Sequence, residues 1–274
     1  SSQSHSSHQE AQRGCLNTVG PQGTMLPAAL EAARAQLAPS GVLRAAINMS
    51  NILLVTGGRE AGAEPQGVAP SMAAEIAARL GVRPKLVPFA HPNLICDAAN
   101  QDAWDIGLVG ADPARAQHID FTPAYCEIQA TYMVQASSSA TLADIDRPGA
   151  RIAVKGGGAY DLWLTRHLRH AELVRAETLD ASYEVFTSQQ LDALAGLRPK
   201  LLSDLEKAPG QYKIVDGHFM AVQQAVGSVK QRDGGAAGHD FLRQFIEEAK
   251  ASGFVQELID RHGVVGRLSV ASGA

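Results

Sequence analysis

The chain has 274 residues, of which 45% are hydrophobic and 19% charged, so it is long and apolar enough to bury one large core or two lobes of ordinary size. Lys and Arg number 24 against 28 Asp and Glu, and the resulting net charge of −4 argues against a nucleic-acid-binding surface or a polybasic membrane anchor. The longest apolar runs are only as long as strands, so we expect no transmembrane helix.

Residues 1–24 are rich in Ser, Gln, Gly and His and show no apolar period, so we expect a disordered leader or an added segment outside the fold. This stretch lacks the charged start, apolar middle and small-residue cleavage site of a secretory signal. Either an export signal has been removed or the chain never had one. The sequence leaves a periplasmic and a cytoplasmic location open.

A first unit of alternating strands and helices begins at Val42. Ser71 is placed to cap a helix that Gly81 ends, and Asp112 with Pro113 opens another helix as cap and first residue. The predicted strands are Val42–Ile47, Lys85–Phe89, Trp104–Val109 and Ile128–Gln135. The other predicted helices are Met25–Leu37, Ser71–Leu80 and Asp97–Ala103.

A second unit follows with the same rhythm. Its predicted strands are Arg151–Val154, Leu173–Ala176, Leu191–Ala195, Tyr212–Val215 and Phe219–Val226. The predicted helices from there to the end are Ala159–His170, Ser182–Gln189, Asp240–Ser252 and Phe254–His262. Alternation of this kind indicates mostly parallel sheets covered by helices on both faces. We expect two such units, with the chain crossing between them twice.

An ordered set of short motifs runs through both units. The six-residue step from Arg115 to Phe121 is part of it, as is a glycine turn at a strand-to-helix junction. The motifs are Trp104–Gly110, Asp112–Arg115, Asp120–Tyr125, Gly67-Val68, Leu80-Gly81, Gly156–Gly158, Lys230 and Gly253-Phe254. Together they resemble the type II periplasmic solute-binding proteins, specifically the amino-acid-binding family (family 3) of ABC transporters. The resemblance covers about residues 40–265.

This resemblance implies a two-lobed α/β fold in which each lobe is a mostly parallel sheet flanked by helices, with two hinge crossovers. Lobe 1 is expected to comprise residues 41–127 and 224–274, and lobe 2 residues 128–223. The implied function is to close two lobes around a small carboxylate-bearing or amino-acid-like ligand for an ABC transporter permease. A periplasmic location follows from the family, and we expect a monomer that needs no cofactor and binds no nucleic acid.

The residues themselves suggest how a carboxylate would be held. Open α/β sheets bind ligands beyond the carboxyl ends of their strands. Arg115 follows such a strand and carries the planar fork of donors that suits a carboxylate. The turn of Gly157, Gly158 and Ala159 offers backbone N–H groups at a helix start, which suits an anion. Arg115 and this turn together predict a two-sided carboxylate clamp.

Other positions depart from the pattern that the resemblance implies. Leu197 stands where an acid usually pairs with the α-ammonium of the ligand, and Arg198 follows it. Asn51 replaces an aromatic that covers the ligand, and Asn48 replaces an Asp. The turn between Gly110 and Arg115 is about two residues short. In that turn Ala111 and Asp112 replace a Thr hydroxyl.

Burying an unpaired cation is costly, so the missing acid favours a carboxylate without a standard α-amino group. In that case Asn48 and Asn51 supply neutral hydrogen bonds, and Asp112 replaces the acid. Each candidate also has a structural alternative. In these alternatives Arg115 pairs with an acid on its own helix, and the glycines only turn the chain. Asn48 and Asn51 then cap the loop after the first strand, and Asp112 caps the helix that it opens.

Two further candidates have structural alternatives of their own. Tyr125 is a candidate for lining the site, and its structural alternative is packing near a hinge. Arg198, which precedes Pro199, is a candidate ligand contact, and its structural alternative is a solvated loop residue.

Two other functions remain open on the same scaffold. The fold also hosts cyclohexadienyl (arogenate or prephenate) dehydratases, whose chemistry needs a general acid, and Asp112 and Glu127 are the nearby acids. The second open function is that of a ligand sensor with no role in transport.

Cys15, Cys96 and Cys126 are too scattered for a disulfide framework or a thiolate zinc site, and His167 with His170 lacks a third ligand nearby in sequence. We therefore expect no catalytic residue and no metal.

Overall fold

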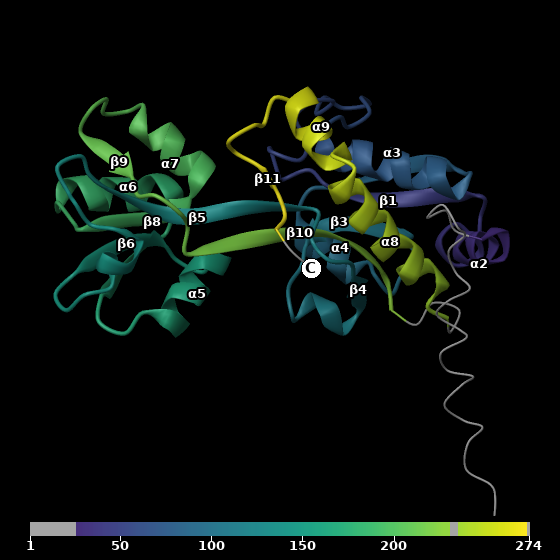
Figure 1. The fold of residues 1–274 in the computed structure, drawn as a ribbon, viewed down its shortest axis with the longest axis horizontal. Helices are drawn as coiled ribbons and strands as arrows, with labels where there is room; N and C mark the ends of the chain where they lie inside the picture. The colour runs from purple at the N-terminus through teal and green to yellow at the C-terminus, as the bar shows by residue number, and fades with distance from the viewer. Residues whose placement is uncertain (1–25, 231–234, 273–274) are drawn as a thin grey trace, which may run out of the picture. The chain divides into compact units, whose positions relative to one another are not determined.

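The computed structural model describes residues 26–230 and 235–272 (Figure 1). The leader expected at residues 1–24 lies outside the described residues. By their internal contacts the residues form two compact units, which we describe separately. Unit 1 runs to Pro123 and resumes over Ala225–Phe254, and unit 2 comprises Ala124–Gln224 with the chain from Val255. Strands and helices alternate in the chain, which confirms the α/β class.

A mostly parallel sheet forms the centre of unit 1. Its strands are β1 (Val42–Asn48), β2 (Arg83–Phe89), β3 (Ile106–Gly110), β4 (Ile119–Phe121) and the last residues of β10 (Met220–Val229). β1 pairs in parallel with β2 on one side and with β3 on the other. β10 lies next to β3 and pairs antiparallel with β4. Because β1 and β3 run in the same direction, the loops after Asn48 and Gly110 leave the sheet at the same edge.

The helical segments of unit 1 are α2 (Pro27–Leu37), α3 (Val68–Leu80), α4 (Pro92–Asp97), the 3₁₀ turn η1 (Arg115–Gln117) and α8 (Ala237–Ala251). α3 packs against β1 and β2, and α2 packs against α8. The core of this unit includes Ile47, Met72, Ile76 and Trp104, each almost fully buried. Trp104 also donates its indole N–H to the Ile95 carbonyl at 2.9 Å, so no buried polar group is left unpaired there.

Three sequence predictions in unit 1 need correction. The helix expected to start at Ser71 begins at Val68, because Gly67 at φ 143° is its N-cap and a side chain there would collide with the Leu54 carbonyl. Its predicted end at Gly81, in the left-handed conformation at φ 73°, is confirmed.

The helix expected over Asp97–Ala103 forms earlier, as α4, because Pro92 presets the dihedral angle of its first turn. The helix expected after Asp112 is only the short turn η1.

Unit 2 is built around β5. Its strands are β5 (Cys126–Gln135), β6 (Arg151–Lys155), β7 (Glu172–Ala176), β8 (Ala193–Leu197), β9 (Tyr212–Ile214), β11 (Ser269–Val270) and the first residues of β10. β5 pairs antiparallel with β8, β9, β10 and β11. β6 lies between β7 and β8 and is parallel to both. Phe186, Met133 and Leu194 are almost fully buried in one of its apolar clusters.

The helical segments of unit 2 are the 3₁₀ turn η2 (Leu142–Ile145), α5 (Ala159–His167), α6 (Leu179–Ser188) and α7 (Arg198–Leu205), and α9 (Phe254–Arg261) begins at its boundary. The tail from Val255 groups with unit 2, whereas the sequence placed it in lobe 1. The reason is that β11 pairs with the start of β5 and that Ala271 donates its N–H to the Tyr125 carbonyl. Among the described residues, no helix is long and apolar enough to cross a membrane.

Candidate functional site

Arg115 lies at the edge of unit 1 where β3 ends. It is half-buried, and its Nη1 donates to the Gly110 carbonyl at 2.8 Å, which fixes the guanidinium beside the end of the strand. In the part of the chain that the structure describes, no carboxylate lies within ion-pair distance of Arg115, and Nε and Nη2 have no hydrogen-bond partner. The structural alternative, an ion pair with an acid on its own helix, is therefore not what the structure contains. The remaining donors suit a carboxylate.

Asp112 closes the short turn between Gly110 and Arg115. Its Oδ1 accepts hydrogen bonds from the N–H groups of Ala114 at 2.7 Å and Arg115 at 3.4 Å. Asp112 and its neighbour Ala111 are exposed. The geometry is that of a loop cap, so one oxygen of the carboxylate is committed to the backbone.

Asn48 and Asn51 both use their side-chain oxygens within their own loop. Asn48 Oδ1 accepts from the N–H and the hydroxyl of Ser50, and Asn51 Oδ1 accepts from the N–H groups of Leu53 and Leu54 at 3.1 and 3.2 Å. An Asn side chain has one accepting oxygen and one donating NH₂ group. With the oxygens occupied, the groups left for a ligand are donors, which match an anion better than an ammonium.

Arg59 is a structural residue that the sequence analysis did not find. Its Nη1 donates to the Met49 carbonyl at 2.7 Å, and its Nη2 donates to the carbonyls of Val55 at 2.6 Å and Asn51 at 3.4 Å. Three carbonyl contacts hold the loop after β1 in one conformation. No sequence signal marks this role, because any arginine in a loop looks the same in a single sequence.

The glycine turn of unit 2 precedes α5. Gly157 adopts φ 85°, and its N–H donates at 2.8 Å to Oδ2 of Asp161 in the first turn of the helix. Asp161 is nearly buried and also meets Arg175, whose Nε lies 3.1 Å from Oδ1. Of the three N–H groups expected to bind an anion, that of Gly157 therefore already donates to a carboxylate of the chain itself. For the N–H groups of Gly158 and Ala159, no partner is found in the described ranges.

The ion pair at Asp161 makes the stability of unit 2 depend on pH. Burial alone would raise the pKa of Asp161, but the Gly157 N–H and the Arg175 guanidinium outweigh it and lower that pKa below its ordinary value of 3.8. A lowered pKa means that the unfolded chain takes up the proton first as the pH falls. The stabilisation is therefore complete well above pH 3.8 and is lost on acidification below it.

We expect Asp161→Asn to be less stable than the parent chain at pH 7 and to lose less further stability on acidification. Urea unfolding at pH 7 and at pH 3.5 measures both values. Asp144, Asp146 and Asp180 also have a lowered pKa, but they are present in both proteins and cancel in the comparison. An equal loss between the two pH values in both proteins would contradict this assignment.

Leu197 and Arg198 lie at the junction of β8 and α7. Leu197 caps the helix, and Arg198 donates from Nε to Gln129 Oε1 at 3.0 Å and from Nη2 to the Gly217 carbonyl at 2.9 Å. Both contacts are within unit 2. Arg198 therefore braces β5 against the turn before β10 and is not a simple solvated loop residue.

Tyr125 has no exposed surface, and its hydroxyl is buried without a partner in the described ranges. Burial raises the pKa of this hydroxyl well above its usual range. A fully buried side chain fits the structural alternative for Tyr125, in which it packs in the interior instead of lining a ligand site. Cys96 and Cys126 are free thiols. Within the residues that the structure describes, no group of three or more His, Cys, Asp or Glu side chains could hold a metal ion.

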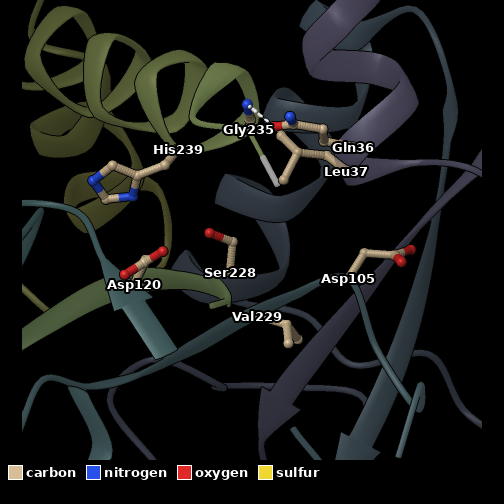
Figure 2. Close-up of a pocket in the computed structure, with 9 residues that line it drawn as sticks. Gln36, Leu37, Asp105, Asp120, Ser228, Val229, Gly235 and His239 are labelled. Carbon is tan, nitrogen blue, oxygen red and sulfur yellow. Dashed lines mark hydrogen bonds between the residues drawn. The ribbon is translucent and has the colours of Figure 1, made fainter. Parts of the chain in front are cut away.

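A small pocket in unit 1 lies between the ends of α2 and α8 and the sheet (Figure 2). His239, Asp120, Ser228 and Asp105 are among the residues that line it, and the Gly238 N–H donates across it to Gln36 at 2.7 Å. The volume open to the centre of a water molecule is ≈ 20 Å³. This is room for about one water, so the pocket is too small for a solute.

Comparison with known proteins identifies the kind of molecule. The family model of bacterial extracellular solute-binding proteins, family 3, matches residues 56–264. An ancestral cationic amino acid solute-binding protein is 19% identical with a TM-score of 0.59, over 85% of this chain and 98% of the other. A putative binding component of an ABC transporter from Wolinella succinogenes, complexed with lysine, is 19% identical with a TM-score of 0.58, over 81% and 95%.

The periplasmic domain of BvgS from B. pertussis is also similar, at 17% identity and a TM-score of 0.66. The match covers 85% of this chain and 45% of that one. At these identities the solved structures show the fold alone. No curated protein matches the sequence.

Proposed function

Because this chain belongs to family 3 of the bacterial extracellular solute-binding proteins, we propose that it binds a small carboxylate as the substrate-binding component of an ABC-type importer. In this proposal Arg115, Asn48 and Asn51 of unit 1 contact the ligand, and the N–H groups of Gly158 and Ala159 in unit 2 are separate candidate donors for an anion. The protein's partner in this proposal is a transporter permease, and its cellular location is the periplasm. We propose that it acts as a monomer.

The observation that carries the proposal is the state of Arg115. The guanidinium is held at the carboxyl edge of β1 and β3 by a single hydrogen bond to Gly110, while its other two nitrogens have no partner in the described ranges. A half-buried cation without an anion costs free energy that a bound carboxylate recovers. The Asn48 and Asn51 side chains add only donors, since their oxygens are used in the loop.

We further propose that the ligand lacks a standard α-amino group. An α-ammonium needs an acceptor, and the position expected to supply one is Leu197, which caps α7 and has no polar side-chain atom. Asp112 is the acid closest in sequence to Arg115, and its Oδ1 is committed to the Ala114 and Arg115 N–H groups. Because Leu197 offers no acceptor for an ammonium group and Asp112 has one oxygen committed to the backbone, the ligand classes that fit best are a 2-oxo acid, an aromatic acid and a dicarboxylate.

We propose a binding protein without enzymatic activity. An ancestral cyclohexadienyl dehydratase is among the similar structures, at 22% identity and a TM-score of 0.54. Neither acid suggested for such chemistry is placed to donate a proton freely. Asp112 caps a loop, and Glu127 is buried and accepts a hydrogen bond from Gln223 Nε2 at 2.8 Å. Prephenate incubated with the protein should therefore yield no phenylpyruvate.

A thermal-shift screen tests the ligand class. The panel contains amino acids, their 2-oxo acid counterparts, aromatic carboxylates and dicarboxylates. A ligand at a hundred times its Kd adds about 2.7 kcal/mol, which raises Tm by about 5 °C or more for a chain of this size. We expect stabilisation only by acids without an α-amino group. Stabilisation by a standard amino acid would contradict the ligand class and point to Asp112 as the ammonium partner.

A further inference from the structure

Two strands build the polar floor of the small pocket in unit 1 (Figure 2). Asp120 on β4 and Ser228 on β10 are register partners in an antiparallel pair, so their side chains share one face of the sheet with Cβ atoms about 5 Å apart. The neighbouring Ile119 packs into an apolar cluster of unit 1. His239, in the first turn of α8, lines the pocket from the helix side. Three polar side chains from three elements therefore surround one small space.

Within the described ranges, none of these three side chains has a partner. The Nδ1 atom of His239 is buried and accepts or donates no hydrogen bond there. The Asp120 carboxylate and the hydroxyl of Ser228, a residue only 8% exposed, likewise form no hydrogen bond or ion pair with the residues that the structure describes. An unsatisfied buried polar group is costly, so such groups in native proteins nearly always bond to protein or to ordered water.

The contact between α2 and α8 sets the position of His239. The Gly238 N–H donates to Gln36 Oε1 at 2.7 Å, which ties the start of α8 to α2. A Cβ atom at Gly238 would lie only 2.9 Å from Leu37 Cγ, so the two helices approach about as closely as a glycine allows. A direct bond from His239 to the floor of the pocket would require this contact to shift.

The size and the chemistry of the space select a single water molecule. A buried water needs about 10–15 Å³ open to its centre and two to four polar partners. The pocket offers ≈ 20 Å³ and three such partners. A carboxylate only accepts hydrogen bonds, whereas a hydroxyl can donate one, and water can serve both. No three His, Cys, Asp or Glu side chains among the described residues form a set that could hold a metal ion instead.

We propose that this pocket binds one ordered water molecule, which donates to the Asp120 carboxylate and to His239 Nδ1 and accepts from the Ser228 hydroxyl. In this arrangement the His239 ring carries its proton on Nε2. The water joins the first turn of α8 to β4 and β10. The site is independent of the proposed carboxylate ligand, because the pocket has no room for a solute.

A crystal structure of the full chain, at a resolution that shows ordered water, tests the proposal directly. We expect one peak of electron density within about 2.6–3.2 Å of His239 Nδ1, an Asp120 carboxylate oxygen and Ser228 Oγ. Absence of a peak, direct hydrogen bonds among the three side chains, or a peak with the anomalous signal of a metal ion would overturn the proposal.

A double-mutant cycle tests the bridge in solution. Ser228→Ala and His239→Phe each remove one partner of the water, and the two side chains do not bond to each other. We expect the effect of the combined variant on the unfolding equilibrium constant to differ at least about twofold from the product of the single effects, because both changes act on one network. Circular dichroism checks that the variants are folded.

The matched control cycle replaces His239→Phe with Glu247→Ala, at an exposed position about two turns further along α8. The effects of Ser228→Ala and Glu247→Ala should multiply, since the two side chains share no partner. Independent effects of Ser228→Ala and His239→Phe, or equal coupling in both cycles, would contradict a water bridge.

Discussion

Replacing Arg115 with Ala is expected to weaken binding of the carboxylate ligand by about 100-fold or more. Loss of one partner from a desolvated, hydrogen-bonded charge pair costs about 2–5 kcal/mol of binding free energy, because the remaining charge is left unpaired. The fold should be little affected, since the half-buried Arg115 side chain makes a single hydrogen bond to the described residues, to the Gly110 carbonyl. Isothermal titration of the best ligand from the screen measures the Kd, and thermal unfolding measures the stability.

Two further variants separate the role of Arg115 from a general effect of charge. Arg115→Lys keeps the charge but loses the planar pair of donors, so we expect an intermediate affinity. Arg166→Ala removes an exposed arginine from α5 and should leave the Kd unchanged. Tight binding retained by Arg115→Ala would contradict the assignment of this residue.

Asp105→Ala is expected to destabilise unit 1 by about 3 kcal/mol or more, the largest stability effect that we predict. The Asp105 carboxylate is fully buried and accepts hydrogen bonds from Arg44 at its backbone N–H, Nε and Nη2, at 2.8, 3.2 and 2.9 Å. Removing one partner of a buried ion pair costs about 3–5 kcal/mol. Because Arg44 is on β1 and Asp105 immediately precedes β3, this pair joins the two strands that carry the candidate site.

The chain supplies the matched control for this prediction. Arg44 also contacts Asp102 at 2.7 Å, but the Asp102 side chain is 78% exposed. Ion pairs at such exposed positions contribute less than about 1 kcal/mol. Urea unfolding of Asp102→Ala should therefore give a much smaller loss than Asp105→Ala. Equal losses in the two variants would show that burial of the carboxylate does not determine the effect.

The sequence predicted the fold well where local signals agree. The apolar run over Trp104–Val109 predicts a strand, and β3 follows it closely. Gly81 predicts the end of α3, because a glycine in the left-handed conformation is a strong local stop. The start of α3 was predicted three residues too late. Ser71 looks like a cap in the sequence, but the contact between Gly67 and Leu54 that sets the true start is not visible there.

The places of the candidate residues in the fold were predictable from the sequence, but their contacts were not. The order of strands identifies the turns that contain Arg115 and Gly157. The order of strands does not show that Asp161 accepts a hydrogen bond from the Gly157 N–H. An acid in the first turn of a helix is nevertheless a sequence signal that could have suggested this contact. The Arg44–Asp105 pair joins residues 61 positions apart, and one sequence without relatives holds no information about such a pair.

The central claim is that the protein recognises a carboxylate through a guanidinium. It is tested most directly by titrating the best acid from the screen and its primary carboxamide under identical conditions. The amide has almost the same shape but carries no charge and cannot accept a bidentate pair of hydrogen bonds from Arg115. We predict that the acid binds and that the carboxamide binds about 100-fold more weakly or not at all. Equal affinities for the two would contradict the account.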